Sequence, residues 1–280
     1  MSNVVANNLM SMNAQRNLNN NTMGLSTAME RLSSGLRVNS AKDDAAGLAV
    51  AERMNSQARG MNVAIRNASD AVSMVRTADG GLQQISDTLQ RMRELAVQSA
   101  NGTYESADRD LLQKEFAELT DELERISDVT QFNKINVLSQ DQVIAFQVGA
   151  NTVIGTDTID VSFANIQATA GMAQVLTAVS VGGGGGAAGA QAAITQIDLA
   201  IDEVNNQRAT FGAAMNRFEA TITNLRNAAE NQTAAMSRIM DADFAQETAA
   251  LTKGQVLQQA GVAILAQANQ APQAVLGLLR

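Results

Sequence analysis

The sequence predicts a mainly α protein, an elongated antiparallel coiled-coil or helix bundle with a small β-hairpin region. Three observations carry this prediction. Apolar residues recur at alternating spacings of three and four over long stretches. The 280 residues contain a single proline, Pro272, so almost nothing interrupts a helix. Alanine supplies 48 residues, and its small side chain and high helix propensity favour closely packed helices.

The composition also excludes most kinds of enzyme site. The chain has no cysteine and no histidine, which removes disulfides, thiolate nucleophiles, serine triads and the usual zinc sites. A carboxylate- or lysine-based enzyme remains open. Asp43 and Asp44 are adjacent, but neighbouring helical residues point about 100° apart, so a helix start explains them better. We predict no catalytic residue, no cofactor and no metal ligand.

The first 40 residues are predicted to be helical but weakly apolar. Their apolar positions are Val5, Leu9, Met12, Leu18, Leu25, Met29, Leu32 and Leu36. Most other positions are Asn, Ser or Ala, so such a helix is marginal in isolation. It becomes reasonable if many copies of the chain pack together and bury the remaining apolar surface.

A helix over 44–100 follows. Its heptad positions are Ala58, Met61, Ile65, Ala68, Val72, Val75, Ala78, Leu82, Ile85, Leu89, Met92 and Ala96. The rhythm shortens once, at Val75–Ala78, beside Gly80-Gly81, where we expect a local bend. Such a helix is roughly 85 Å long, whereas a compact 280-residue globule is only about 50 Å across. The sequence therefore predicts a rod.

Two further helices are predicted by the same spacing. The shorter one, over 104–129, carries Leu112, Phe116, Leu119, Leu123 and Ile126. The longer one, over 194–236, continues its rhythm to Ile239, with polar exceptions at Arg208 and Gln232. Polar residues in such a seam often fix the register of the packed helices.

The residue composition changes between these helices. Residues 143–148 and 158–163 are β-branched and aromatic, which predicts a β-hairpin at about 142–163. Residues 164–193 are rich in Gly and Ala and include five consecutive glycines from Gly182. We expect this segment to be a flexible loop with no core of its own. Residues 244–280 then resemble the first 40, with apolar positions at Phe244, Leu251, Val256, Leu257, Ile264, Leu265, Val275, Leu278 and Leu279.

Charge and hydropathy limit the partners. The net charge is −8, and residues 103–128 carry nine acidic against three basic side chains. A chain without a basic patch is a poor nucleic-acid binder, so we expect no nucleic-acid partner. No apolar run is long enough to insert into a membrane. The first residues lack the features of a secretory signal peptide, which by itself suggests a cytosolic protein.

Several long motifs resemble the bacterial flagellin family. They are Arg31-Leu-Ser-Ser-Gly-Leu-Arg-Val-Asn-Ser-Ala-Lys-Asp-Asp-Ala-Ala-Gly-Leu-Ala49, Leu89-Gln-Arg-Met-Arg-Glu-Leu-Ala-Val-Gln-Ser99, Thr130-Gln-Phe-Asn133, Ser237-Arg-Ile-Met-Asp-Ala-Asp-Phe-Ala245, Gln258-Gln-Ala-Gly261, Leu265-Ala-Gln-Ala-Asn-Gln270 and the ending from Pro272 to Arg280. The resemblance covers about 1–163 and 194–280.

The resemblance implies a domain arrangement. Residues 1–43 and 237–280 would pair as a two-helix coiled coil, the inner domain of a tubular filament. Residues 44–163 and 194–236 would form the rod domain, and 164–193 a short outer loop in place of the large outer domains of many flagellins. The terminal-helix residues that would carry assembly are Val5, Leu9, Leu32, Leu36, Val256, Leu257, Ile264, Leu265, Leu278 and Leu279.

The resemblance also implies a function. The chain would self-polymerise into the extracellular flagellar filament for swimming motility, after export in an unfolded state by the flagellar type III apparatus. Its implied partners are the export chaperone, held by the C-terminal helix, and the filament cap and hook-associated junction proteins. Gln90, Arg91, Leu95 and Glu115 resemble a surface that serves subunit contact and, in some flagellins, the vertebrate innate receptor. The alternatives are a hook–filament junction protein and, in another class, an enzyme built on a flagellin frame.

Overall fold

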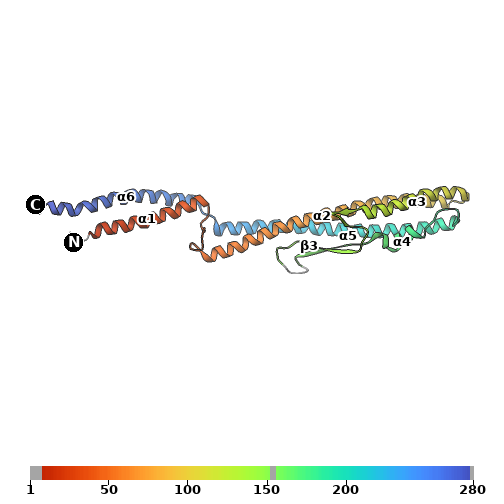
Figure 1. The fold of residues 1–280 in the computed structure, drawn as a ribbon, viewed down its shortest axis with the longest axis horizontal. Coiled ribbons are helices and arrows are strands. Elements are labelled where there is room, and N and C mark those ends of the chain that lie inside the picture. The colour runs from red at the N-terminus through yellow and green to blue at the C-terminus, as the bar shows by residue number, and fades with distance from the viewer. Residues whose placement is uncertain (1–7, 152–155, 278–280) are drawn as a thin grey trace. The chain divides into compact units, whose positions relative to one another are not determined.

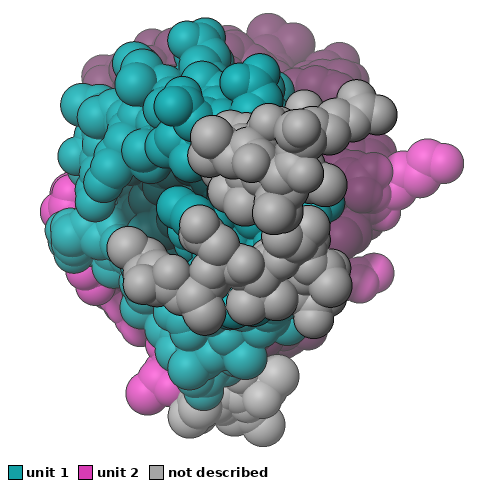
Figure 2. Space-filling model, turned by 90° about the vertical axis from the view of Figure 1, so that its left-hand side faces the viewer, with its two compact units in different colours: residues 1–57, 230–280 teal, residues 58–229 magenta. Residues whose placement is uncertain are grey.

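The computed structural model describes residues 8–151 and 156–277, with side chains up to 270. The chain divides into two compact units, residues 1–57 with 230–280 and residues 58–229 (Figure 2). Helices account for most of the described chain, so the prediction of a mainly α fold is confirmed (Figure 1). The elements are α1 (Leu9–Ser34), α2 (Ala45–Ala100), α3 (Ser106–Val129), β1 (Gln131–Phe132), β2 (Ile135–Asn136), β3 (Gln142–Gln147), β4 (Thr158–Phe163), the 3-10 turn η1 (Ile166–Ala168), α4 (Ala170–Thr177), α5 (Gly186–Met240) and α6 (Phe244–Gly277).

The first unit is built on the pairing of α1 with α6, which lie side by side (Figure 1). The two helices are antiparallel, because hydrogen bonds join Asn8 to Ala268 and Asn21 to Gly254. Gly35, with φ 72°, ends α1 in the left-handed conformation that glycine favours. The next residues form a β-bridge, Leu36 with Asp241, so the chain leaving α1 is tied to the chain entering α6.

The second unit contains the main apolar core, formed by α2, α3 and α5 together with the β3–β4 hairpin. From Ala68 onward, the heptad residues predicted for α2 are buried, and Leu82, Leu89 and Met92 are fully so. From α5 the core receives Ile197, Val204, Phe211 and Phe218. The helix α2 continues through Gly80-Gly81. A Cβ at Gly81 would lie 2.8 Å from Leu138 and Thr130, so this glycine permits a close approach.

Two β-hairpins lie between α3 and α5. The pair β1–β2 was not predicted; its two-residue turn, Asn133-Lys134, has positive φ at both positions, as a type I′ hairpin turn requires. The hairpin predicted at 142–163 consists of β3 and β4, paired from Gln142–Phe163 to Gln147–Thr158. In β4 alternate side chains, Ile159, Val161 and Phe163, are buried, and they fix this hairpin on the helices.

Residues 164–193 differ from the flexible loop that we predicted. They form η1, α4 and the start of α5, and they bury Ile166, Met172, Val175 and Val181. Two side chains of neighbouring helices secure the backbone. The Glu203 carboxylate accepts hydrogen bonds from the amides of Gly171 and Met172 at 3.1–3.4 Å, and Gln113 Oε1 accepts from those of Val181 and Gly182 at 2.7 and 3.0 Å. Tertiary contacts therefore outweigh the flexible composition.

Candidate assembly surfaces

The α1–α6 pair contains a narrow seam. Along α1 the partly or fully buried residues recur at spacings of three and four, and the same holds for α6. They are Ser11, Ala14, Leu18, Asn21, Leu25, Ala28 and Leu32 in α1, where Arg31 is also partly buried beside Leu32, and Glu247, Leu251, Gly254, Gln258, Gly261, Leu265 and Ala268 in α6. This is the heptad rhythm of a two-helix coiled coil. Since only five of the fourteen are leucine, the pair buries little apolar surface in the single chain.

Close packing and hydrogen bonds make up for the small side chains in the seam. Added Cβ atoms at Gly254 and Gly261 would lie 3.0 and 3.1 Å from Leu25 and Leu18, so the two glycines form the recesses that receive these leucines. Asn21 Nδ2 donates to the Gly254 carbonyl at 2.8 Å. Counting only large apolar residues finds the five leucines of this seam but misses most of the positions between them. Counting Asn, Ala and Gly at the same spacing fills most of these positions.

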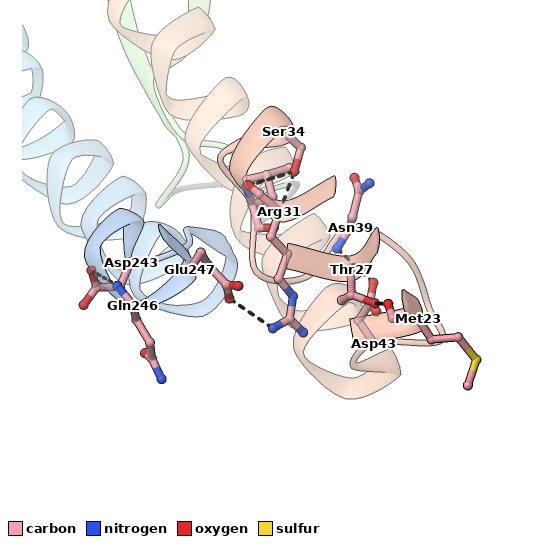
Figure 3. Close-up of polar contacts among 10 residues, drawn as sticks. Met23, Thr27, Arg31, Ser34, Asn39, Asp43, Asp243, Gln246 and Glu247 are labelled. Atoms are coloured by element: carbon pink, nitrogen blue, oxygen red, sulfur yellow. Dashed lines mark hydrogen bonds and ion pairs between the residues drawn. The ribbon is translucent and has the colours of Figure 1, made fainter. Parts of the chain in front are cut away.

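One ion pair closes the end of the seam nearest the bridge (Figure 3). Arg31 Nη1 lies 3.2 Å from Glu247 Oε1, with side chains 30% and 14% exposed. Asp243 starts α6, where its carboxylate accepts from the amides of Ala245 and Gln246. Such caps satisfy the free amides of a helix start. The polar groups here therefore serve to hold α1 against α6.

Asp43 likewise accepts hydrogen bonds from backbone amides, in the loop before α2. Its carboxylate accepts hydrogen bonds from the Ser40 hydroxyl and amide, both at 2.9 Å. It also accepts one from the Asn39 amide at 3.2 Å (Figure 3). These bonds, the one from the Ser40 hydroxyl foremost, lower the pKa of Asp43 below its ordinary value.

Outside the seam, both terminal helices expose large apolar side chains. On α1 these are Leu9, Met10, Met12, Met23 and Met29, and on α6 Phe244, Val256, Leu257, Val262 and Ile264, each between 48% and 66% exposed. A hollow of about 290 Å³ lies among them, lined by Met10, Ala263, Ile264, Gln267 and Ala268. We call these two sets the outer faces of α1 and α6. Apolar exposure on this scale is typical of a surface that meets a partner.

The predicted assembly residues of the termini fall into three groups. Leu9, Val256, Leu257 and Ile264 belong to the outer faces. Leu32, Leu36 and Leu265 are half-buried, and two of them, Leu32 and Leu265, belong to the seam. Val5, Leu278 and Leu279 lie outside the described residues.

The second predicted surface centres on Arg91 of α2. Its guanidinium donates to Glu115 Oε1 of α3, from Nε at 3.0 Å and Nη2 at 2.7 Å, and to Glu94 at 2.9 Å. These hydrogen bonds, with that to Glu115 the largest influence, raise the pKa of Arg91. Gln90 is exposed beside it. The structure corrects the prediction for Leu95, which is 1% exposed and packs in the core. Its place in the helical period faces inward, so it is not part of this surface.

Neither surface resembles a chemical centre. In the described parts of the chain, no three acidic, histidine or cysteine side chains gather as a metal site would require. None of the described helices combines the length and hydropathy needed to cross a membrane.

Comparison with known proteins decides what the two terminal regions are. Residues 5–143 match the family model of the bacterial flagellin N-terminal helical region, and residues 194–279 that of the C-terminal helical region. The chain is 46% identical over 280 residues to a flagellin of Halalkalibacterium halodurans, covering 99% of this chain and 100% of that one. The chain belongs to the bacterial flagellin family. The resemblance stated from the sequence motifs is thereby confirmed.

A second relative agrees with this assignment. The flagellar filament 33 kDa core protein of Treponema phagedenis is 43% identical, over 99% of this chain and 100% of that one. A crystal structure of Bacillus cereus flagellin aligns with a TM-score of 0.49 and 34% identity, over 61% of this chain and 94% of that one. The protein is thus a structural subunit that polymerises into the extracellular flagellar filament, and it is not an enzyme.

Proposed function

We propose that the outer faces of α1 and α6 are the surfaces by which one flagellin subunit binds its neighbours in the filament. The observation that supports this most directly is the contrast between seam and outer face. The seam holds mostly small or polar residues, whereas the ten large apolar side chains of the outer faces are 48–66% exposed. Burying apolar surface drives association, so these exposed apolar side chains are available to bind other subunits.

Charge placed on the outer face of α6 tests the proposal. The double variant Val256→Glu, Ile264→Glu puts carboxylates at two exposed apolar positions and leaves the seam intact. Its matched control is Gln255→Glu, Gln259→Glu, which adds the same charge at exposed polar positions of α6 that do not line the hollow. We expect the first variant to lose polymerisation, because burying each carboxylate carries a large desolvation cost, and the control to form filaments. Electron microscopy and sedimentation measure both.

Deletion of residues 1–40 or 245–280 tests the same proposal more broadly. We expect either truncation to abolish polymerisation and to leave the helical circular dichroism of residues 58–229, whose core is separate. Long filaments from a truncated chain, or equal filament yields from the two charged double variants, would contradict the proposal.

We further propose that Gln90, Arg91 and Glu115 form an axial subunit contact that an innate immune receptor also recognises. Supporting this are the exposure of the three side chains and the fixed geometry of the Arg91–Glu115 pair. Arg91→Ala should weaken both filament formation and receptor activation, whereas Arg125→Ala, which removes an exposed arginine paired only within α3, should affect neither. An Arg91→Ala protein unchanged in both assays argues against a shared surface.

For delivery we propose export in an unfolded state through the flagellar type III apparatus, with α6 held by an export chaperone until it pairs with α1. The support is that α6 has large apolar residues in the seam and on its outer face. The cap and hook-associated junction proteins would then meet the ends of the filament. Copy number in purified filaments separates this role from that of a junction protein, which would be present in few copies.

A further inference from the structure

The outer face of α1 differs from that of α6 in chemistry. Within the described residues, α1 exposes five large apolar side chains, and four of them are methionine: Met10, Met12, Met23 and Met29, at 66%, 56%, 64% and 56% exposure. The outer face of α6 is built from Phe, Val, Leu and Ile, and α6 contains no methionine. Most of the large exposed apolar side chains of α1 are therefore thioethers, whereas those of α6 are hydrocarbons.

The remaining methionines with described side chains are shielded by the fold. Met74, Met92 and Met172 are only 3%, 0% and 2% exposed, and the others are half-buried. Susceptibility of methionine to oxidation follows its exposure. An oxidant in solution will therefore react first with the four methionines of α1, while the core of residues 58–229 stays reduced.

We propose that Met10, Met12, Met23 and Met29 form an oxidation-sensitive modification site that decides whether a subunit can polymerise. This inference rests on the proposed role of the outer faces. The oxidant is hydrogen peroxide: its O–O bond breaks, one oxygen forms an S–O bond, the sulfur is oxidised by two electrons, and the second oxygen leaves as water. The flexible apolar side chain becomes a polar sulfoxide.

The surroundings of these residues explain why the modification blocks assembly. Met10 lines the hollow with Ala263, Ile264, Gln267 and Ala268, so its sulfoxide oxygen would face mainly apolar carbon, with the Gln267 side chain as one polar group there. Met12 and Met23 are eleven residues apart, about three helical turns, and so lie on one side of α1. A sulfoxide buried at a subunit interface without a hydrogen-bond donor weakens association. A subunit already in the filament has the same sulfurs covered by its neighbours and is protected.

The experiment compares full-length monomer and filament after hydrogen peroxide treatment. Peptide mass spectrometry should find sulfoxide in the monomer at the four α1 methionines and not at Met74, Met92 or Met172, and little sulfoxide at any of them in filaments. The critical concentration for polymerisation of the oxidised monomer should rise about tenfold or more, with its helical circular dichroism unchanged. Treatment with methionine sulfoxide reductases should restore the original value.

A variant identifies the residues responsible. Met10, Met12, Met23 and Met29 are replaced together by Leu, which has similar volume and helix propensity. The variant should polymerise as the unmodified chain does and keep its critical concentration after peroxide. Oxidised unmodified protein that polymerises normally overturns the inference, as does equal peroxide sensitivity in the variant. If the variant itself fails to polymerise, the reductase treatment of unmodified protein decides.

The outcomes separate this inference from the proposed function. The charged variant of α6 contains all the methionines and is studied without peroxide. Normal filaments from that variant would overturn the proposed role of the outer faces. Loss of filaments from that variant, combined with normal polymerisation of oxidised protein, would overturn the methionine site alone.

Discussion

The two units of this flagellin bury different kinds of side chain. In residues 58–229 the core holds fully buried phenylalanine, leucine, isoleucine and methionine, and all the largest fully buried side chains lie there. Among the described residues of 1–57 and 230–280 the buried positions are Ala28, Val38, Ala51, Gly254 and Ala268, and large apolar residues are exposed instead. Both units are helical, so secondary structure does not distinguish them.

The difference indicates which part of the fold is complete in one chain. A core of large side chains stabilises its unit without help, since each fully buried Leu or Phe contributes about 1.5–3 kcal/mol. The α1–α6 seam gives far less, because nine of its fourteen positions are small or polar residues. If the outer faces bind other subunits as proposed, the first unit gains its remaining stability on assembly, and stability and self-association belong to separate units of one polypeptide.

The largest loss of stability should come from removing a large side chain from the core of the second unit. Phe211 is fully buried and its ring lies 5.3 Å from that of Phe163, so Phe211→Ala should cost about 3–5 kcal/mol. Leu18→Ala in the half-buried α1–α6 seam should cost about 1 kcal/mol in the monomer. Urea unfolding of both variants, followed by circular dichroism, measures the difference. Equal losses would remove the distinction between the units.

Glycine substitutions should sharpen the contrast in packing density. Gly171 of α4 faces α5, and an added Cβ would lie 2.6 Å from the backbone nitrogen of Ala200. Gly171→Ala should therefore cost about 1–3 kcal/mol through overpacking. Gly80→Ala is the control: nothing lies within 4 Å of its added Cβ, so the gain in helix propensity should stabilise by about 0.8–1 kcal/mol. Opposite shifts of the midpoint in urea are expected.

Arg208, one of the two polar residues in the α5 heptads, should have a smaller effect on stability. Arg208 Nε lies 2.9 Å from Asp79 Oδ1, and both side chains are about a third exposed. Arg208→Met should destabilise by up to about 1 kcal/mol at low salt, and less at high salt. The control Arg76→Met removes a longer pair at 3.6 Å whose side chains are 67% and 59% exposed, and should change little. A double-mutant cycle in two salt concentrations measures both couplings.

The smallest effect concerns pH in the first unit. The pKa of Asp43 is lowered in the folded chain, mainly by the Ser40 hydroxyl. A lowered folded pKa gives a contribution to stability that is present above the unfolded value of about 3.9 and is lost as pH falls through the folded value. Ser40→Ala should move the Asp43 pKa back upward. A carboxyl-carbon NMR titration measures the shift, and an unchanged pKa would show that the hydroxyl bond is absent in solution.

Local pattern made much of the fold predictable. The long helices α2 and α5 and the hairpin β3–β4 follow from heptad spacing and β-branched runs, because each pattern refers to neighbours within a few residues. The α1–α6 seam was harder, since its register depends on Gly254 and Gly261 receiving leucines more than 200 residues away. Leu95 was assigned to a surface by resemblance, although its helical position turns it into the core.

The sequence by itself determined that this protein is helical, that it has no histidine or cysteine chemistry, and that its termini carry apolar residues at helical spacing. These properties reside in composition and short-range periodicity. Only the tertiary structure decided the order within 164–185, where the amides of Gly171, Val181 and Gly182 meet the acceptors Glu203 and Gln113. It also decided which terminal side chains face the seam and which face outward. Both depend on distant parts of the chain, whose approach no local pattern encodes.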